Sequence, residues 1–270
     1  MNLRRTTLIA SLLLLSPGLL SARAQQVDVQ EIIARSAKVT NADWNTEPEY
    51  DYSDSVKQNG HTKTYDELMV LGSRYERLIA VDGKPLTGQQ KAEQQQKLDQ
   101  VIAQRRAETP AQRSQRIAKW NQSRERNHLL VEQLTKAFDF KLEGTPMLDG
   151  RDVYELSATP RPGYQPPNNH AKVLTGMVGT LWIDQKTFQW VKVEAKVIHP
   201  VSIEGFLARV DPGTRFELKQ APVEPGVWLP TFFSMRARAK VFFLFSHNSQ
   251  EQDTFSDYRK ASTEDIPAGQ

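Results

Sequence analysis

The sequence has no cysteine among its 270 residues. A chain without cysteine can form no disulfide, and it offers no thiol for attachment of a lipid anchor. It must therefore rely on its hydrophobic core for stability, and a chain of this length can bury a core large enough for that.

Long apolar runs are scarce as well. The longest lies near the N-terminus, where two arginines precede an apolar run over residues 8–20, and the small residues Ala22 and Ala24 occupy the two cleavage-determining positions that follow. This pattern is typical of a secretory signal peptide, and the run is shorter than the roughly 20 apolar residues of a membrane span. We expect 1–24 to be cleaved as a signal peptide. The remainder, 25–270, is then expected to be a periplasmic or secreted protein that is not integral to a membrane and folds as a single domain.

An excess of one charge sign is also absent once that segment is removed. The whole chain has 35 basic and 32 acidic residues, and three of the basic ones lie within 1–24, so the rest is balanced. Nucleic-acid-binding proteins usually carry a basic field, so we expect no nucleic-acid partner. The charge is uneven along the chain, because 25–83 has 11 acidic and 6 basic residues whereas 84–137 has 5 and 11.

Motifs for catalysis, metals and phosphates are lacking. Asp184 and Glu194 could form an acid–base pair, but a turn and a polar strand face explain both carboxylates better. His170 follows Asn168-Asn169 in the Pro-rich loop and could face a pocket, but a solvated loop position explains it better. We therefore expect a protein that is not an enzyme and has no cofactor and no metal. The five histidines are scattered and form no two-histidine metal motif: His61, His128, His170, His199 and His247.

A basic insert at about 87–137 has the composition of helix. Thr109-Pro110 marks a helix start and divides the insert into helices at about 87–107 and 110–137. The first helix has few apolar residues (Leu98, Val101 and Ile102) and should lie mostly in water. The second has a single apolar stripe made of Ile117, Trp120, Val131, Leu134 and Phe138. A short helix at 29–39 should pack on a sheet through Ile32, Ile33 and Ala37.

The rest of the chain alternates in the manner of strands separated by short turns. In the clearest hairpin, Val191, Val193, Ala195 and Val197 alternate with Trp190, Lys192, Glu194 and Lys196. We expect an antiparallel meander with one face covered by the helices, and an ordered loop over the Pro-rich segment 161–169. The predicted strands are 65–71 and 75–81 around Gly72-Ser73-Arg74, then 152–158, 177–183, 189–198, 203–210, 214–220, 228–239, 241–245 and 254–260.

Aromatic and aliphatic residues are concentrated late in the chain. If 231–245 continues as one strand without a bulge, its odd positions from Phe233 to Phe245 form an apolar face. Arg236, Arg238 and Lys240 oppose that face as a basic stripe. Such a face is either an ordinary core surface or the lining of a cavity, and the stripe either is solvated or meets an anionic head group.

The runs Gly179-Thr-Leu-Trp-Ile-Asp184 and Phe188-Gln-Trp-Val-Lys-Val-Glu194, together with the order of the predicted elements, carry a family resemblance. The sequence resembles the LolA/LolB-like superfamily of periplasmic lipoprotein carriers. It also looks like a family of uncharacterised exported bacterial proteins in the runs Arg74–Leu86, Lys136–Leu142 and 158–167. The resemblance implies an α+β fold in which a curved antiparallel sheet forms an incomplete barrel, helices cover its concave face, and an apolar cavity receives acyl chains. The helical pair at 87–137 is an insertion relative to the carriers.

The resemblance and the apolar strand faces together predict a periplasmic, non-enzymatic carrier or binding protein for a hydrophobic ligand, such as a lipid or a lipidated protein. The alternative is an envelope protein–protein interaction or sensing module that uses the basic helical insert and the Pro-rich loop. The candidate cavity residues are Leu181, Ile183, Val191, Val193, Phe233, Met235, Val241, Phe243 and Phe245.

Overall fold

A computed structural model describes residues 28–203, 208–241 and 245–262. The expected signal peptide and its cleavage site at Ala24 lie outside these ranges. Among the residues described, no helix is both long and apolar enough to cross a membrane.

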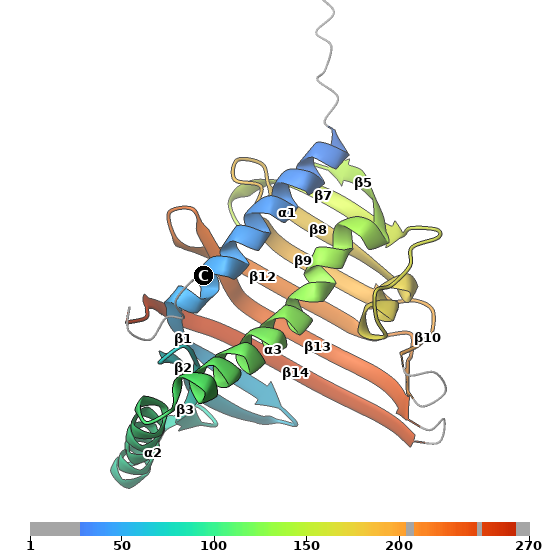
Figure 1. Ribbon diagram of the computed structural model, residues 1–270. Helices are drawn as coiled ribbons and strands as arrows, with labels where there is room; N and C mark the ends of the chain where they lie inside the picture. The colour runs from blue at the N-terminus through green and yellow to red at the C-terminus, as the bar shows by residue number, and fades with distance from the viewer. Residues whose placement is uncertain (1–27, 204–207, 242–244, 263–270) are drawn as a thin grey trace, which may run out of the picture.

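One large antiparallel sheet, with helices against one face, forms the body of the protein (Figure 1). Its first part is a meander of consecutive strands: β1 (Tyr50–Gln58), β2 (His61–Val70), β3 (Ser73–Val81) and the short β4 (Lys84–Pro85). Its second part is a longer meander: β5 (Phe138–Gly144), β7 (Arg151–Pro160), β8 (Met177–Asp184), β9 (Trp190–Val197), β12 (Arg215–Glu224), β13 (Val227–Val241) and β14 (Phe245–Lys260).

The two meanders become one sheet because β14 pairs antiparallel with β1, which joins the end of the chain to its beginning. The strand order is β4-β3-β2-β1-β14-β13-β12-β9-β8-β7-β5. The described strands β4 and β5 stand at opposite edges, so the sheet is not closed into a barrel. The expected α+β fold with a large antiparallel sheet is confirmed.

Two-residue turns set the register of the first meander. Asn59-Gly60 links β1 to β2 and Leu71-Gly72 links β2 to β3, and all four residues have positive φ. Such paired positive φ angles are typical of type I′ turns, whose twist matches that of the strands. The second turn therefore begins one residue earlier than expected, and Ser73 already pairs with Val70. The Asn-Gly pair is the sequence signal for β1, a strand that the hydrophobic pattern did not predict.

The first helix, α1 (Val29–Thr46), begins at Asp28, whose side chain accepts a hydrogen bond from the backbone N–H of Gln30 at 2.9 Å. The helix packs on the sheet as expected, but it runs well past the predicted end at residue 39. The extra turns are stabilised by contacts that the local sequence does not reveal: Asn41 with His128 at 2.8 Å, and Asp43 with the backbone N–H of Trp228 at 3.1 Å.

The insert forms α2 (Gly88–Arg106) and α3 (Pro110–Ala137), close to the predicted bounds. Each helix has a complete capping box, Thr87 with Gln90 and Thr109 with Gln112, so its start is encoded locally. In α2 only Leu98 is buried, as expected of a helix mostly in water. Phe138, expected at the end of the α3 stripe, is instead the first residue of β5.

Arginines of the insert hold the helices onto the turn between β2 and β3. The Arg105 guanidinium donates to the carbonyls of Val70 at 2.6 Å and Ser73 at 2.8 Å. The Arg116 guanidinium donates to the carbonyl of Leu71 at 3.0 Å and pairs with Glu108 at 2.7 Å. Part of the positive charge of the insert is therefore engaged in hydrogen bonds and an ion pair within the protein.

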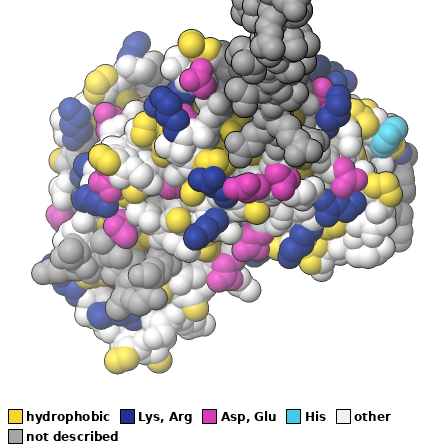
Figure 2. Space-filling view, turned by 90° about the horizontal axis from the view of Figure 1, so that it is seen from above, with side chains coloured by type: hydrophobic (Ala, Val, Ile, Leu, Met, Phe, Trp, Pro, Cys, Tyr) yellow, Lys and Arg dark blue, Asp and Glu magenta, His cyan; other side chains and the backbone are white. Residues whose placement is uncertain are grey.

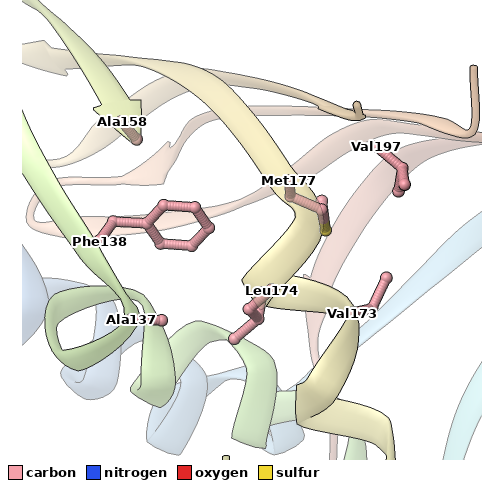
Figure 3. Packing of buried hydrophobic residues seen from close by; sticks show 7 residues of the cluster. All are labelled: Ala137, Phe138, Ala158, Val173, Leu174, Met177 and Val197. Atoms are coloured by element: carbon pink, nitrogen blue, oxygen red, sulfur yellow. The ribbon is translucent and has the colours of Figure 1, made fainter. Parts of the chain in front are cut away.

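The hydrophobic core lies between the sheet and the helices. Figure 3 shows one cluster, in which Phe138 extends from the chain just after α3 and meets residues from β7, β8, β9 and η2 (His170–Gly176). A second cluster packs Ile32 and Ile33 of α1 on strand residues Leu156, Leu181, Ile183 and Trp190. The loop over 161–169 is irregular as expected, and the Tyr164 hydroxyl donates to Gln133 of α3 at 3.0 Å.

Two strand predictions need correction. The predicted strand 203–210 is replaced by β10 (Val201–Ser202) and β11 (Ala208–Val210), and 204–207 lie outside the described residues. The predicted strand 241–245 does not exist as such, because Val241 ends β13 and Phe245 begins β14, with 242–244 outside the described residues. One uninterrupted ladder from Phe232–Thr254 to Val241–Phe245 makes these segments a hairpin, so cross-strand pairing and not local composition sets the strand ends.

Basic and acidic side chains are intermixed on the face seen in Figure 2, with hydrophobic atoms scattered between them. This pattern is ordinary for a protein surface.

Candidate functional site

A cavity of about 900 Å³ lies between the sheet and the helices α1 and α3. Its roof contains Trp44 of α1 and Trp120 and Val131 of α3, and its floor is formed by strands from both meanders. Nine aromatic residues are part of the lining: Trp44, Tyr52, Tyr75, Trp120, Trp190, Trp228, Phe233, Phe255 and Tyr258.

Part of the apolar stripe of α3 lines this cavity. Trp120 and Val131 are only half-buried although they point toward the protein interior. A stripe packed directly against a sheet would be fully buried. Part of the apolar surface of Trp120 and Val131 is therefore not covered by other described residues.

Polar and aromatic contacts join the two roof helices. The rings of Trp44 and His128 stack with centroids 4.3 Å apart, and His128 Nε2 lies 2.8 Å from Asn41 Oδ1. The Arg124 guanidinium lies over the Trp44 ring at 4.4 Å and donates to the Trp44 carbonyl at 2.6 Å. Burial lowers the pKa of His128, which favours the neutral ring.

Buried hydrogen bonds fix α1 to the sheet beside the cavity. Trp190 Nε1 donates to Ser36 Oγ at 2.6 Å. Asp43 Oδ1 accepts from the Trp228 backbone N–H at 3.1 Å and from Gln189 at 3.4 Å. Burial is the largest influence on Asp43 and raises its pKa to about 6, despite these hydrogen bonds.

A second, smaller cavity of about 300 Å³ continues beneath the same two helices. Val131 and Trp190 line both spaces, so the two meet at these residues. Leu181 and Phe140 form part of the lining of the smaller cavity.

The structure separates the predicted cavity residues. Phe233 lines the large cavity, Leu181 lines the small one, and Met235 lines a third hollow of about 700 Å³ over β7 to β14. Val193 packs against the core cluster that contains Leu181, and Ile183 is completely buried in it.

Val191 lies on the other side of the sheet from Val193, contrary to the expected alternation. The pairing of β8 with β9 shifts between Trp182–Lys192 and Ile183–Trp190, which is a β-bulge at Val191. The bulge turns Trp190 toward α1 and places Val191 in a separate cluster with Val153 and Trp228. The remaining candidates, Val241, Phe243 and Phe245, have side chains outside the described residues.

Carboxylates on the strands of the first meander are part of the site, and the sequence analysis missed them. Asp54 of β1, Glu67 of β2 and Glu76 of β3 all line the large cavity. Burial is the largest influence on the first two, and with neighbouring acidic charge it raises the pKa of Asp54 to about 7 and that of Glu67 to about 8. The available signal was the excess of acidic residues over 25–83.

The acid–base pair considered from sequence is not assembled. Asp184 accepts hydrogen bonds from the backbone N–H groups of Lys186 at 2.9 Å and Thr187 at 2.8 Å, which is the role of a turn residue. Glu194 pairs instead with Lys192 on the neighbouring position of the same face. His170 is exposed. Among the described residues no three acidic or histidine side chains are grouped as metal ligands.

No family model and no curated protein matches the sequence. Solved structures similar to this chain include a LolA superfamily protein from Nitrosomonas europaea, at 10% identity over 87% of this chain and 94% of that one, with a TM-score of 0.33. A domain from Vibrio parahaemolyticus described as outer membrane lipoprotein-sorting aligns at 11% identity over 86% and 94%, with a TM-score of 0.33. The MucA/MucB complex of Pseudomonas aeruginosa aligns at 12% identity over 84% and 99%, with a TM-score of 0.22. The LolA superfamily that the sequence resembles is thus among the structural matches.

Proposed function

We propose that the protein is a periplasmic, non-enzymatic carrier or binding protein that holds a hydrophobic ligand, a lipid or a lipidated chain, beneath α1 and α3. The observation that carries this proposal is the cavity of about 900 Å³, whose lining includes nine aromatic rings. Its volume lies within the range of roughly 300–1,000 Å³ that is usual for small-molecule sites. The half-buried Trp120, Val131 and Phe233 supply apolar surface that a ligand would remove from water.

The roof suits a site that must open and close. α1 and α3 are joined over the cavity by a stacked ring pair and by hydrogen bonds from His128 and Arg124, as described above. A seam of this kind can separate without exposing a closely packed apolar core, because its polar groups can bond water when it opens.

Native mass spectrometry of residues 25–270, purified from a periplasm without detergent, tests the proposal. We expect a bound lipid near one per chain, identified by solvent extraction and lipid analysis. A mass that is apo, and stays apo after incubation with envelope lipids, would contradict the proposal.

A pair of variants locates the site. Phe233→Arg places a charged side chain in the cavity and should abolish lipid retention. Phe232→Arg is the matched control, because Phe232 is the adjacent residue on the opposite face of β13 and is likewise half-buried. Equal loss of lipid in both variants, with native circular dichroism spectra, would place the ligand elsewhere.

A second candidate function is binding of an envelope protein partner through α2. This helix buries only Leu98 and is otherwise largely exposed, and in Figure 1 it extends beyond the edge of the sheet. Removing all of 87–137 would also remove the cavity roof, so charge reversal of the exposed Lys91, Lys97 and Arg106 is the cleaner test. A partner that copurifies with the wild type should be lost from this variant; full retention would exclude the surface.

A further inference from the structure

The large cavity has an apolar half and an acidic half, and the two meet at Phe233. In the sheet register, Phe233 lies directly opposite Leu218 of β12 on one side and Asp253 of β14 on the other. Beyond β14, the cavity floor continues onto β1, β2 and β3. A ligand lying along this floor would thus pass from apolar to acidic side chains.

Acidic groups outnumber basic ones in the lining. The only guanidinium groups among the described lining residues are those of Arg74 and Arg124, and both pair with the same carboxylate, Glu47. Arg74 also donates to the carbonyl of Tyr50 at 2.7 Å, and Arg124 to that of Trp44 at 2.6 Å. The lining carboxylates are those of Asp43, Glu47, Asp54, Glu67 and Glu76.

Among these carboxylates, Glu67 combines deep burial with the lack of a polar partner for its side chain among the described residues. The residue is only 6% exposed and lines the cavity, yet within the described part of the chain its carboxylate has neither a hydrogen bond nor an ion pair. Two nearby carboxylate oxygens, Asp54 Oδ1 and Asp253 Oδ1, are fully buried and have no hydrogen-bond partner among the described residues. Buried polar groups in proteins are normally satisfied, and an unsatisfied carboxylate costs several times more than an unsatisfied neutral group.

The neighbouring residue shows that this sheet can satisfy a buried acid. Asp66 is 7% exposed, and its two oxygens lie 2.5 Å from Arg77 and 2.5 Å from Arg259. Successive residues of a strand point to opposite faces, so Asp66 faces away from the cavity and Glu67 faces into it. Of these two neighbouring acids, the one that faces away from the cavity is paired and the one that faces into it is not.

Aromatic rings stand beside these acids. Tyr52 is the direct cross-strand neighbour of Glu67, and Phe255 is that of Asp54. The centroid of the Tyr52 ring lies 5.9 Å from that of Phe255 and 5.2 Å from that of Tyr258, and the Arg74 guanidinium lies over the Tyr52 ring at 4.6 Å. The Phe255 ring is therefore the one available to a bound cation. Carboxylates combined with aromatic faces form the usual environment for an alkylated ammonium group, which is attracted by both.

We propose that the acidic half of the cavity, formed by Asp54, Glu67 and Glu76 with the ring of Phe255, binds the cationic ammonium head of an amphiphile. Its alkyl chain lies over Phe233 and Leu218 in the apolar half. This inference rests on the proposed function, and it names the ligand class: a single-chain or lipid amphiphile with a positively charged head.

Proton release provides a signature of this binding. Burial and the charge of Glu76 raise the pKa of Glu67 to about 8, against the opposing effect of Arg74, and Asp54 and Glu47 act in the same direction as Glu76. Much of the Glu67 population is therefore protonated at neutral pH in the empty protein. A bound cation favours the carboxylate, so binding should release protons.

Calorimetric titration of residues 25–270 with dodecyltrimethylammonium tests the proposal, with dodecyl maltoside and dodecyl sulfate as neutral and anionic probes of equal chain length, all below micellar concentrations. We expect the cationic probe to bind at least tenfold more tightly than the neutral one. Titrations in two buffers of different ionisation enthalpy should show proton release at neutral pH, a readout that needs no variant.

Two variants separate the possible results. Glu67→Gln should reduce affinity for the cationic probe to that for the neutral probe, whereas Glu93→Gln, an exposed position on α2, should change nothing. If all three probes bind equally and Glu67→Gln has no effect, the hydrophobic site stands and the cationic preference is wrong. If no probe binds to folded protein, both proposals fail. A lysine-rich peptide without an alkyl chain serves as a further probe. If it binds more tightly than the cationic probe, the ligand is not an amphiphile and a protein ligand is indicated.

Discussion

Glu67→Gln should stabilise the empty protein, although it replaces a buried residue. Glutamine keeps the shape of the side chain and removes the charge that burial opposes. Glu67 is 6% exposed, and its pKa is raised from an ordinary 4.5 to about 8 by burial first and by Glu76 second. Folding therefore requires Glu67 to retain a proton that the unfolded chain releases.

The sign and size of the effect follow from this difference in proton affinity. A raised acid pKa makes no difference to stability below about pH 4.5, lowers stability progressively as the pH rises toward 8, and has its full effect above that. At about 1.4 kcal/mol per pKa unit, the cost near pH 7.5 is on the order of 2–4 kcal/mol. Glu67→Gln should recover this amount near pH 7.5 and almost none near pH 4.5.

Urea denaturation followed by circular dichroism, at several pH values between about 4.5 and 8.5, measures the effect. Asp66→Asn is the matched control, because Asp66 is equally buried but pairs with Arg77 and Arg259. It should destabilise the protein by about 1.5–3 kcal/mol. The reasoning would be refuted if Glu67→Gln destabilised the protein as much as Asp66→Asn does, or if its effect did not change with pH.

Three further substitutions test how the structure is held together. Gly179→Ala should destabilise the protein by about 1–3 kcal/mol, because an added Cβ would lie 2.7 Å from the Glu194 carbonyl oxygen, whereas Gly144→Ala, with its nearest atom at 3.9 Å, should be nearly neutral in the same urea titration. Trp190→Phe removes the donor to Ser36 and should cost about 1–3 kcal/mol, and no change in the urea midpoint would show that water replaces this bond. Arg116→Ala removes the contacts that hold α3 on the turn between β2 and β3; it should cost about 2–3 kcal/mol, and increased hydrogen exchange confined to the helices would confirm the location.

Elements whose signals lie within a few residues could be predicted from the amino-acid sequence. The capping boxes at Thr87 and Thr109 fix the starts of α2 and α3, since each needs only residues within one turn. The alternation and the Asp184 turn likewise identify the hairpin of β8 and β9. The α+β fold with helices over an antiparallel sheet follows from the sum of such signals.

Tertiary structure decided the rest. The pairing of β1 with β14 joins segments from opposite ends of the chain, and the bulge at Val191 exchanges the faces of two residues without any local mark. The acidic half of the cavity is the clearest case, because Asp54, Glu67 and Glu76 come from three strands and meet only when the first meander folds. A count of charge along the chain shows that acidic residues are in excess there. Only the folded sheet brings two arginines into ion pairs with Asp66 and leaves Glu67 without an ion pair among the described residues. The reason is that neighbouring residues of a strand face opposite sides of the sheet.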